Sequence, residues 1–180
     1  MISKFKVLLI IMSLLFVWSC ADKKKEISEI IEVDMEMQMY NAYNEGYIEF
    51  KRGDALLAAK KFNEAELLFP QSVWAPKSAL MAAYSYYSQN YYNDSIYELE
   101  RFIKTYPKNE NIGYANYLLA MNFYEQIVDE KKDLGSIIEA RNQFEIVMKN
   151  YPFSEFAIDA QFKLDLINEI LAAKEMYIAR

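Results

Sequence analysis

The side chains that most often carry out catalysis are scarce in this chain of 180 residues. It has no histidine and one cysteine, whereas histidine is the commonest general base and thiolate metal sites need several cysteines. Carboxylate pairs such as Glu64/Glu66 and Asp129/Glu130 stand among other charged residues, a pattern typical of a solvated surface. The four glycines form no phosphate-binding loop. We therefore expect no catalytic residues, no metal site and no cofactor, and a protein that is not an enzyme.

The thiol of Cys20 is the one reactive group in an informative context. Residues 1–19 carry two lysines near their start, followed by an apolar run over 7–18 that ends at the small Ser19. This order is that of a secretion signal. The apolar run is shorter than the roughly 20 residues that a membrane-spanning helix needs. The sequence therefore favours a signal that is removed over a helix that stays in the membrane.

A cysteine placed directly after such a signal resembles the lipobox of bacterial lipoproteins, in which the cysteine receives the lipid. Trp18 departs from that pattern, because a small residue is usual at its position. We expect a lipoprotein signal peptide over 1–19, lipidation at Cys20 and a lipidated tether over 20–37. An ordinary cleaved signal that leaves a free thiol is the alternative.

The charge of the chain excludes two classes of partner. Its formal net charge is −6 at pH 7, and removal of the lysine-bearing signal would make it more negative. Nucleic acids and anionic lipid surfaces bind most favourably to a basic protein surface. We therefore expect no nucleic-acid partner, and contact with a membrane only through the lipid anchor.

The rest of the chain is organised by a recurring helix stop. Phe69-Pro70, Tyr106-Pro107 and Tyr151-Pro152 place an aromatic residue before a proline, and such a residue is pushed out of the helical conformation. Between the stops, small residues recur at helical spacing, as in Ala79, Ala82 and Ala83. This pattern predicts pairs of antiparallel helices of about tetratricopeptide length, for which the usual period is about 34 residues.

Two sets of positions align between the repeats. The second helix of each pair has a small residue at Ala58, Ser95 and Ala140 and a bulky one at Phe62, Leu99 and Phe144. The first helices have their closest contact at Gly46, Ala83 and Ala120. We predict an all-α fold in which tetratricopeptide-like helix-turn-helix repeats stack as an α-solenoid.

The expected helices follow from these stops and from candidate caps. The first runs from about 38 to 52 and ends at Gly53, with Tyr43, Gly46, Tyr47 and Phe50 along its apolar side. The later ones cover about 54–69, two helices between 76 and 106, 111–127 and 135–151; Asn93 or Asp94 caps the second of the central pair. A last helix follows Ser154 with an apolar stripe of Ala157, Ala160, Phe162, Leu164, Leu166, Ile167, Ile170 and Leu171. It has no stop, so the repeat domain, 38–180, is expected to be truncated at its C-terminus.

Tyrosine is the side chain that the chain offers for binding. There are 15 tyrosines, and tyrosine combines apolar area with a hydroxyl at low entropic cost. In a stack of such pairs, the first helices line the concave side. We predict a peptide-binding groove formed by Tyr84, Tyr87, Tyr114, Tyr117, Tyr124, Leu80 and Met121, with Lys77 beside it and with Tyr40, Tyr43, Tyr47 and Phe50 as counterparts in the first unit. Ordinary core packing is the alternative role for these rings.

The sequence resembles the BamD (ComL/YfiO) family of lipoproteins in the outer-membrane β-barrel assembly machinery. The resemblance covers about 38–180 and is most specific in ELERFIKTYPKNENIGYANYLLAMNFYEQIVD, residues 98–129. Family members have about five repeats and bind BamA largely through their C-terminal half, most of which lies beyond this chain. The resemblance implies a lipid-anchored protein of the outer membrane that faces the periplasm. It also implies that the partners are BamA, other assembly subunits and unfolded outer-membrane proteins.

Two functions fit these expectations. The first is an adaptor that holds substrate peptides during assembly and insertion of β-barrel proteins into the outer membrane. The second is a periplasmic tetratricopeptide scaffold for cell-envelope or division proteins.

Overall fold

The computed structural model describes residues 24–127 and 134–178, with side chains described from residue 35 to 127 and from 134 to 176. The predicted signal peptide, Cys20 and the Asp129/Glu130 pair lie outside these residues. The chain divides into two compact units, Met1–Gln38 and Met39–Arg180. The described part of the first unit is helical, and the repeat structure belongs to the second.

The described residues form seven helices and no strand. The first two are α2 (Lys24–Arg52) and α3 (Ala55–Leu68). Two further pairs follow, α4 (Trp74–Ser88) with α5 (Tyr92–Thr105), and α6 (Ile112–Glu125) with α7 (Gly135–Asn150). The last helix is α8 (Glu155–Ile178). The all-α prediction is confirmed.

The aromatic-proline stops end the helices at the predicted positions. Phe69, Tyr106 and Tyr151 are the C-cap residues of α3, α5 and α7. The backbone N–H groups of Tyr106 and Tyr151 still bond to the helix, at 2.8 Å from Phe102 O and Val147 O, before proline prevents a further turn. At the end of α2, Gly53 takes φ 84°, which residues with a side chain rarely adopt.

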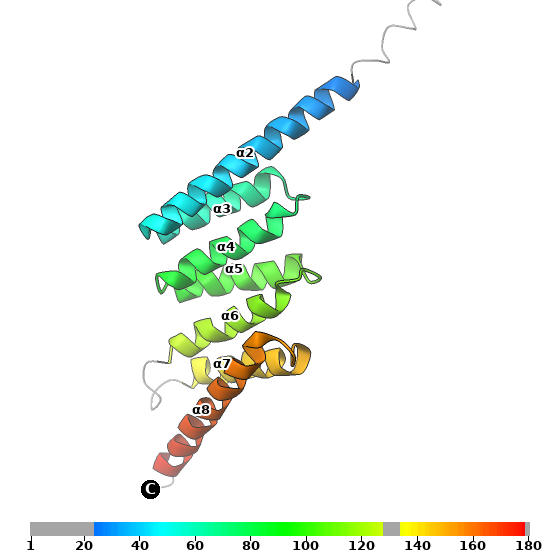
Figure 1. Ribbon diagram of the computed structural model, residues 1–180. Helices are drawn as coiled ribbons and strands as arrows, with labels where there is room; N and C mark the ends of the chain where they lie inside the picture. The colour runs from blue at the N-terminus through cyan, green and yellow to red at the C-terminus, as the bar shows by residue number, and fades with distance from the viewer. Residues whose placement is uncertain (1–23, 128–133, 179–180) are drawn as a thin grey trace, which may run out of the picture. The chain divides into compact units, whose positions relative to one another are not determined.

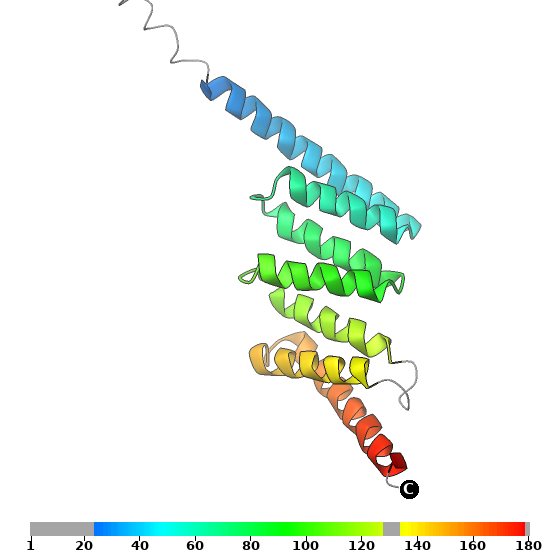
Figure 2. The ribbon, with the colours of Figure 1, turned by 180° about the vertical axis from the view of Figure 1, so that it is seen from behind.

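Within the second unit the helices stack in sequence. Helix α4 packs against α3 and α5, α6 packs against α5 and α7, and α8 packs against α7 and also touches α6. The first helices of the pairs lie on one side of this stack (Figure 1), and α3, α5 and α7 lie on the other (Figure 2). This is the arrangement of an α-solenoid, in which each pair contacts its neighbours.

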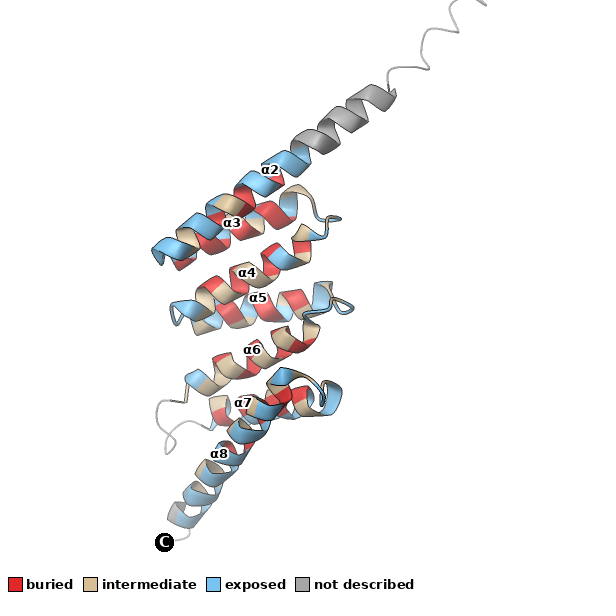
Figure 3. Cartoon of the chain, in the orientation of Figure 1, coloured by how far each residue is buried: buried red, intermediate tan, exposed pale blue. Residues whose placement is uncertain are grey.

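Small residues allow the helices of a pair to approach closely. The aligned residues Ala58, Ser95 and Ala140 are fully buried, and so are their bulky counterparts one turn later. At Gly46 a Cβ atom would lie 3.0 Å from Cδ1 of Phe62, so the ring occupies the space that a side chain would need. The buried faces recur along the helices where they meet (Figure 3). The predicted repeat alignment is therefore confirmed.

The starts of α2 and α5 and the capping of α8 differ from the prediction. Helix α2 begins at Lys24 instead of near residue 38, within the segment expected to be mostly a tether. Helix α5 has Tyr91 as N-cap, so Asn93 and Asp94 lie inside its first turn; the left-handed Asn90 (φ 64°) turns the chain earlier than expected. Ser154 precedes α8 as predicted, but its hydroxyl donates to Tyr151 O at 2.8 Å.

Two of the predicted apolar stripes are narrower than expected. Tyr47 on α2 is 44% exposed, whereas Tyr43 and Gly46 are buried and Phe50 is half-buried. On α8, Phe162 and Leu166 are exposed at 64% and 46%, because the face that meets α7 follows Ala157, Ala160, Leu164 and Ile167. A run of apolar residues identified the helix but did not identify which of them face its neighbour.

Candidate functional site: an aromatic strip across four helices

The predicted groove residues are all half-buried. Leu80, Tyr84, Tyr87 and Tyr114 pack at the edge of the core shared by α4, α5 and α6, and Tyr117, Met121 and Tyr124 pack at the edge of the core shared by α6, α7 and α8. Each side chain therefore contributes to packing and keeps part of its surface in solvent. Whether they bind a peptide stays a prediction.

Two groups of contacting rings lie at neighbouring positions of the stack, and together we call them the aromatic strip: Phe50, Tyr84 and Tyr87 in one group, and Tyr114, Tyr117 and Phe156 in the other. Ring centroids are 5.7 Å apart between Phe50 and Tyr84 and 6.3 Å between Tyr84 and Tyr87. At the other end, Phe156 lies 5.2 Å from Tyr114 and stacks on Tyr117 at 5.3 Å with an interplanar angle of 26°. The strip thus draws on α2, α4, α6 and α8.

The tyrosine hydroxyls in the middle of the strip lie close enough to influence one another's pKa. Burial, together with the nearby Tyr84 and Tyr87, raises the pKa of Tyr114 to about 12. Burial also raises the pKa of Tyr87, with smaller contributions from Glu125, Tyr92 and Asp159. Because a raised pKa keeps a phenol protonated, these groups are neutral hydrogen-bond donors at physiological pH.

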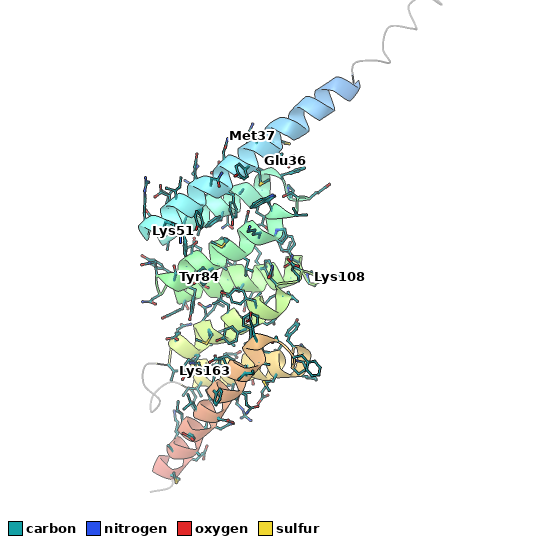
Figure 4. The ribbon with its side chains drawn as sticks, in the orientation of Figure 1. Glu36, Met37, Lys51, Tyr84, Lys108 and Lys163 are labelled. Carbon is teal, nitrogen blue, oxygen red and sulfur yellow. The ribbon has the colours of Figure 1, made fainter. Side chains whose placement is uncertain are left out.

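The carboxylate of Asp159 on α8 is hydrogen-bonded to a ring of the strip. Its Oδ2 accepts a hydrogen bond of 2.6 Å from the Tyr117 hydroxyl. Burial and then this bond raise the pKa of Tyr117. One turn later, the ammonium of Lys163 lies 4.5 Å from the centroid of the Tyr124 ring. Figure 4 locates Lys163 on α8 and Tyr84 on α4.

A second aromatic cluster lies where α2 meets the start of α4. Trp74 packs edge-on against Tyr43 and Tyr40, with centroids 5.0 and 6.1 Å apart. The Lys77 ammonium lies 4.4 Å from the Trp74 centroid and 5.5 Å from that of Tyr43. Cation–π contacts of this kind are worth about 0.5–1 kcal/mol at exposed sites. Lys77, expected beside the groove, is thus fixed by aromatic faces.

Helices α3 and α5 are joined by a polar network, which corrects the expectation for Glu66. That residue was predicted to be solvated, yet Glu66 as a whole is only 5% exposed. Its carboxylate is fully engaged. It accepts hydrogen bonds from Arg101 Nη1 and Nη2 at 2.8 and 2.6 Å and from the Tyr106 hydroxyl at 2.7 Å. Arg101 Nε also donates to the buried Glu98 at 2.9 Å. By contrast, Glu64 is exposed and pairs with Lys61, as a surface carboxylate does.

Two hollows lie away from the aromatic strip. One, of about 620 Å³, opens on α3 and α4 and is lined by Lys60, Asn63, Glu64, Leu67, Leu68 and Tyr86. The other, of about 350 Å³, lies between the α2–α3 and α4–α5 turns. No group of carboxylate side chains in the described part of the chain is arranged to hold a metal ion. None of the described helices is long and apolar enough to cross a membrane.

Several residues of the site were not found from the sequence. Phe156 and Asp159 were missed because the repeat alignment stopped at the third aromatic-proline stop, although α8 packs on α7 and touches α6. Trp74 was missed because the first helix of the central pair was expected to begin at Pro76. Extending the alignment past Pro152 would have placed Phe156 beside the tyrosines of α6.

The sequence matches the family model described as "YfiO: Outer membrane lipoprotein" over residues 35–180. The chain belongs to the YfiO family. Its relatives include proteins named outer membrane protein assembly factor BamD. The one from Caulobacter vibrioides is 37% identical over 89% of this chain and 52% of its own length. The one from Rickettsia prowazekii is 34% identical over 82% of this chain and 59% of its own.

A BamD of Neisseria meningitidis serogroup A is more distant, at 24% identity over 97% of this chain and 69% of its own length. The chain therefore spans about half to two thirds of the YfiO relatives that it matches. The match confirms the predicted family. The relatives are named as assembly factors, which agrees with the class of function expected from the sequence.

Proposed function

We propose that this YfiO-family chain is an adaptor in the assembly of β-barrel proteins into the outer membrane, anchored there through lipid on Cys20 and facing the periplasm. Its partners are BamA, other subunits of the assembly machinery and unfolded outer-membrane protein substrates. The aromatic strip is the observation that carries the proposal, because six half-buried rings on the alternate helices α2, α4, α6 and α8 offer an extended apolar surface, and four of the six carry a hydroxyl group.

The strip suits an extended chain for physical reasons. A strand of a barrel protein alternates apolar and polar side chains, so its apolar face can contact the rings while the backbone groups along its edge contact the hydroxyl groups. Tyrosine provides both kinds of contact without ordering a long flexible side chain. The rings of the strip are held by packed helices, so the protein itself loses little conformational entropy when a peptide binds.

The test is a titration of the full chain, in detergent, against a fluorescent peptide from the C-terminus of a β-barrel protein, followed by anisotropy. Truncating a hot-spot ring typically costs about 2 kcal/mol or more. Tyr84→Ala combined with Tyr117→Ala should therefore weaken binding by well over tenfold. Neutralising the charged residues of the segment between α6 and α7 should change mainly the salt dependence of binding.

The matched control removes two exposed tyrosines outside the strip, Tyr91→Ala with Tyr97→Ala, which should leave the affinity within about twofold. Circular dichroism confirms that each variant is helical, and the single Tyr84→Ala change serves if the double variant unfolds. Unchanged binding by the folded strip variant would refute the proposal.

The choice between adaptor and scaffold rests on the partners. Affinity purification of the full chain from detergent-solubilised membranes should recover BamA and barrel precursors. Recovery of peptidoglycan synthases or division proteins in their place would favour the scaffold instead.

A further inference from the structure

The carboxylate of Asp159 is oriented beside the aromatic strip by one hydrogen bond and, among the described residues, has no cation as a partner. Its Oδ2 is held by the Tyr117 hydroxyl, and in the part of the chain that the structure describes no lysine or arginine nitrogen lies within 4.0 Å of it. Asp159 is half-buried, so water screens its charge less than that of an exposed carboxylate. An oriented carboxylate without a cation is arranged to receive one.

The nearest candidate cation within the same helix is engaged elsewhere. Lys163 stands one turn after Asp159, a spacing at which opposite charges often pair on a helix. Its ammonium instead lies over the ring of Tyr124. A second carboxylate, that of the exposed Glu125, acts with Asp159 and with burial, the largest cause, to raise the pKa of Tyr87. The end of the strip on α6 and α8 is therefore negative.

Aromatic faces flank the same carboxylate. Phe156 precedes Asp159 by three residues on α8 and stacks on Tyr117, whose hydroxyl makes the bond to Asp159. A guanidinium group matches this pair of features. It is planar and weakly hydrated, it stacks on aromatic rings, and it donates parallel hydrogen bonds to a carboxylate. The ammonium group of a lysine would make the same charge interaction with the carboxylate, but it would gain less binding energy than a guanidinium from contact with the aromatic rings.

We infer that Asp159 determines specificity within the strip by binding an arginine side chain of the peptide, which lies against Phe156 and Tyr117. This inference rests on the proposed peptide-binding function and adds a charge requirement to it. The strip then selects an extended peptide in which an arginine accompanies aromatic or aliphatic residues.

The experiment compares three versions of one barrel-derived peptide, with arginine, lysine or glutamine at the same position, on the full chain in detergent. A charge-assisted hydrogen bond is worth enough for about tenfold in affinity. The arginine peptide should bind about tenfold more tightly than the glutamine peptide, and the lysine peptide should lie between them. The variant is Asp159→Asn, which keeps an oxygen for the Tyr117 hydroxyl and so preserves the strip.

The matched control is Asp165→Asn, on the same helix. Asp165 is exposed and accepts a hydrogen bond from Gln161, away from the strip, and its replacement changes the net charge equally. Asp159→Asn should reduce the preference for arginine over glutamine to less than twofold, and Asp165→Asn should preserve it.

Three results would overturn the inference: equal binding of the three peptides by the unaltered chain, retention of the arginine preference in Asp159→Asn, or an equal loss of preference in both variants. In each of these cases the peptides still bind and Tyr84→Ala still weakens them, so the proposed function survives. If no version of the peptide binds, the proposed function and this inference both fail.

Discussion

At the scale of single residues, the clearest departure from expectation is the polar network around Glu66 and Arg101. Two carboxylates share one guanidinium there, with side-chain exposures of 7% for Glu66, 9% for Glu98 and 31% for Arg101. The hydrogen bonds that Arg101 donates to Glu66 are the main reason why the pKa of Arg101 is raised. The arginine therefore stays charged, and its loss would leave two nearly buried carboxylates unpaired.

We predict that Arg101→Met destabilises the fold. Removing one partner of a buried ion pair costs about 3–5 kcal/mol, and we expect the low end because Arg101 is partly exposed. The measurement is urea unfolding followed by circular dichroism. Arg141→Met is the control, since Arg141 and Glu145 form an exposed pair that is worth about 0–1 kcal/mol. Equal unfolding midpoints for the two variants would show that the network does not hold α3 to α5.

The same residues show what a sequence can and cannot predict at this scale. Ala58, Ser95 and Ala140 were identified because a repeat supplies three independent observations of one position. Glu66 belongs to no such set, and its partner Arg101 stands 35 residues later. The rings of the strip were identified by type and face, but the pairing of Tyr117 with Asp159 depends on how α6 and α8 cross, which periodicity does not specify.

At the scale of elements, helix ends were predicted more accurately than helix starts. Proline excludes continuation of a helix on steric grounds, so the ends of α3, α5 and α7 follow from local sequence. A start can be made by a side-chain cap or by a turn alone. Helix α5 uses the second route, because a left-handed Asn90 and the bond from Tyr91 N to Tyr86 O set its first turn.

We predict that the close helix contacts tolerate no added volume. Ala83 and Ala120 are fully buried at the aligned contact positions, and overpacking typically costs about 1–3 kcal/mol. Ala83→Leu and Ala120→Leu should therefore lower the thermal unfolding midpoint. Ala172→Leu makes the same change on an exposed part of α8 and should leave the midpoint nearly unchanged. If all three variants melted together, the repeat alignment would not describe the energetics of the stack.

At the scale of the whole molecule, the order of helix pairs followed from the sequence because repeats are local. Each unit is specified by residues that are close in the chain, so no distant pairing had to be guessed. The long apolar run of α8 was the exception. Its exposed residues Ile158, Phe162 and Leu166 recur every four positions, on the face turned away from α7. Hydrophobic periodicity alone cannot tell a covered face from an uncovered one.

We predict that the attachment of the molecule to a membrane depends on Cys20. Cys20→Ser should move the protein from the membrane fraction to the soluble fraction, because a single apolar anchor would be lost and the repeat domain has no described membrane-spanning helix. Mass spectrometry of the unaltered protein should find acyl chains on this cysteine. Continued membrane attachment of the variant, with no acyl chains on the original, would contradict the lipoprotein assignment.

The hydrogen bonds that skip a helix have a mechanical consequence. Among the described residues, side-chain hydrogen bonds join α3 to α5 and α6 to α8. Helices α4, α5 and α6 instead share an apolar core. Hydrogen bonds resist the sliding of one helix along another because their energy depends on direction. Apolar contacts are not directional, so they allow such sliding at a smaller cost in free energy. We expect the stack to be stiff between its first two pairs and again at α8, and to bend most easily at the α5–α6 junction. Tyr84 and Tyr114 lie on opposite sides of that junction, so bending would increase or decrease the distance between these two rings at the centre of the strip.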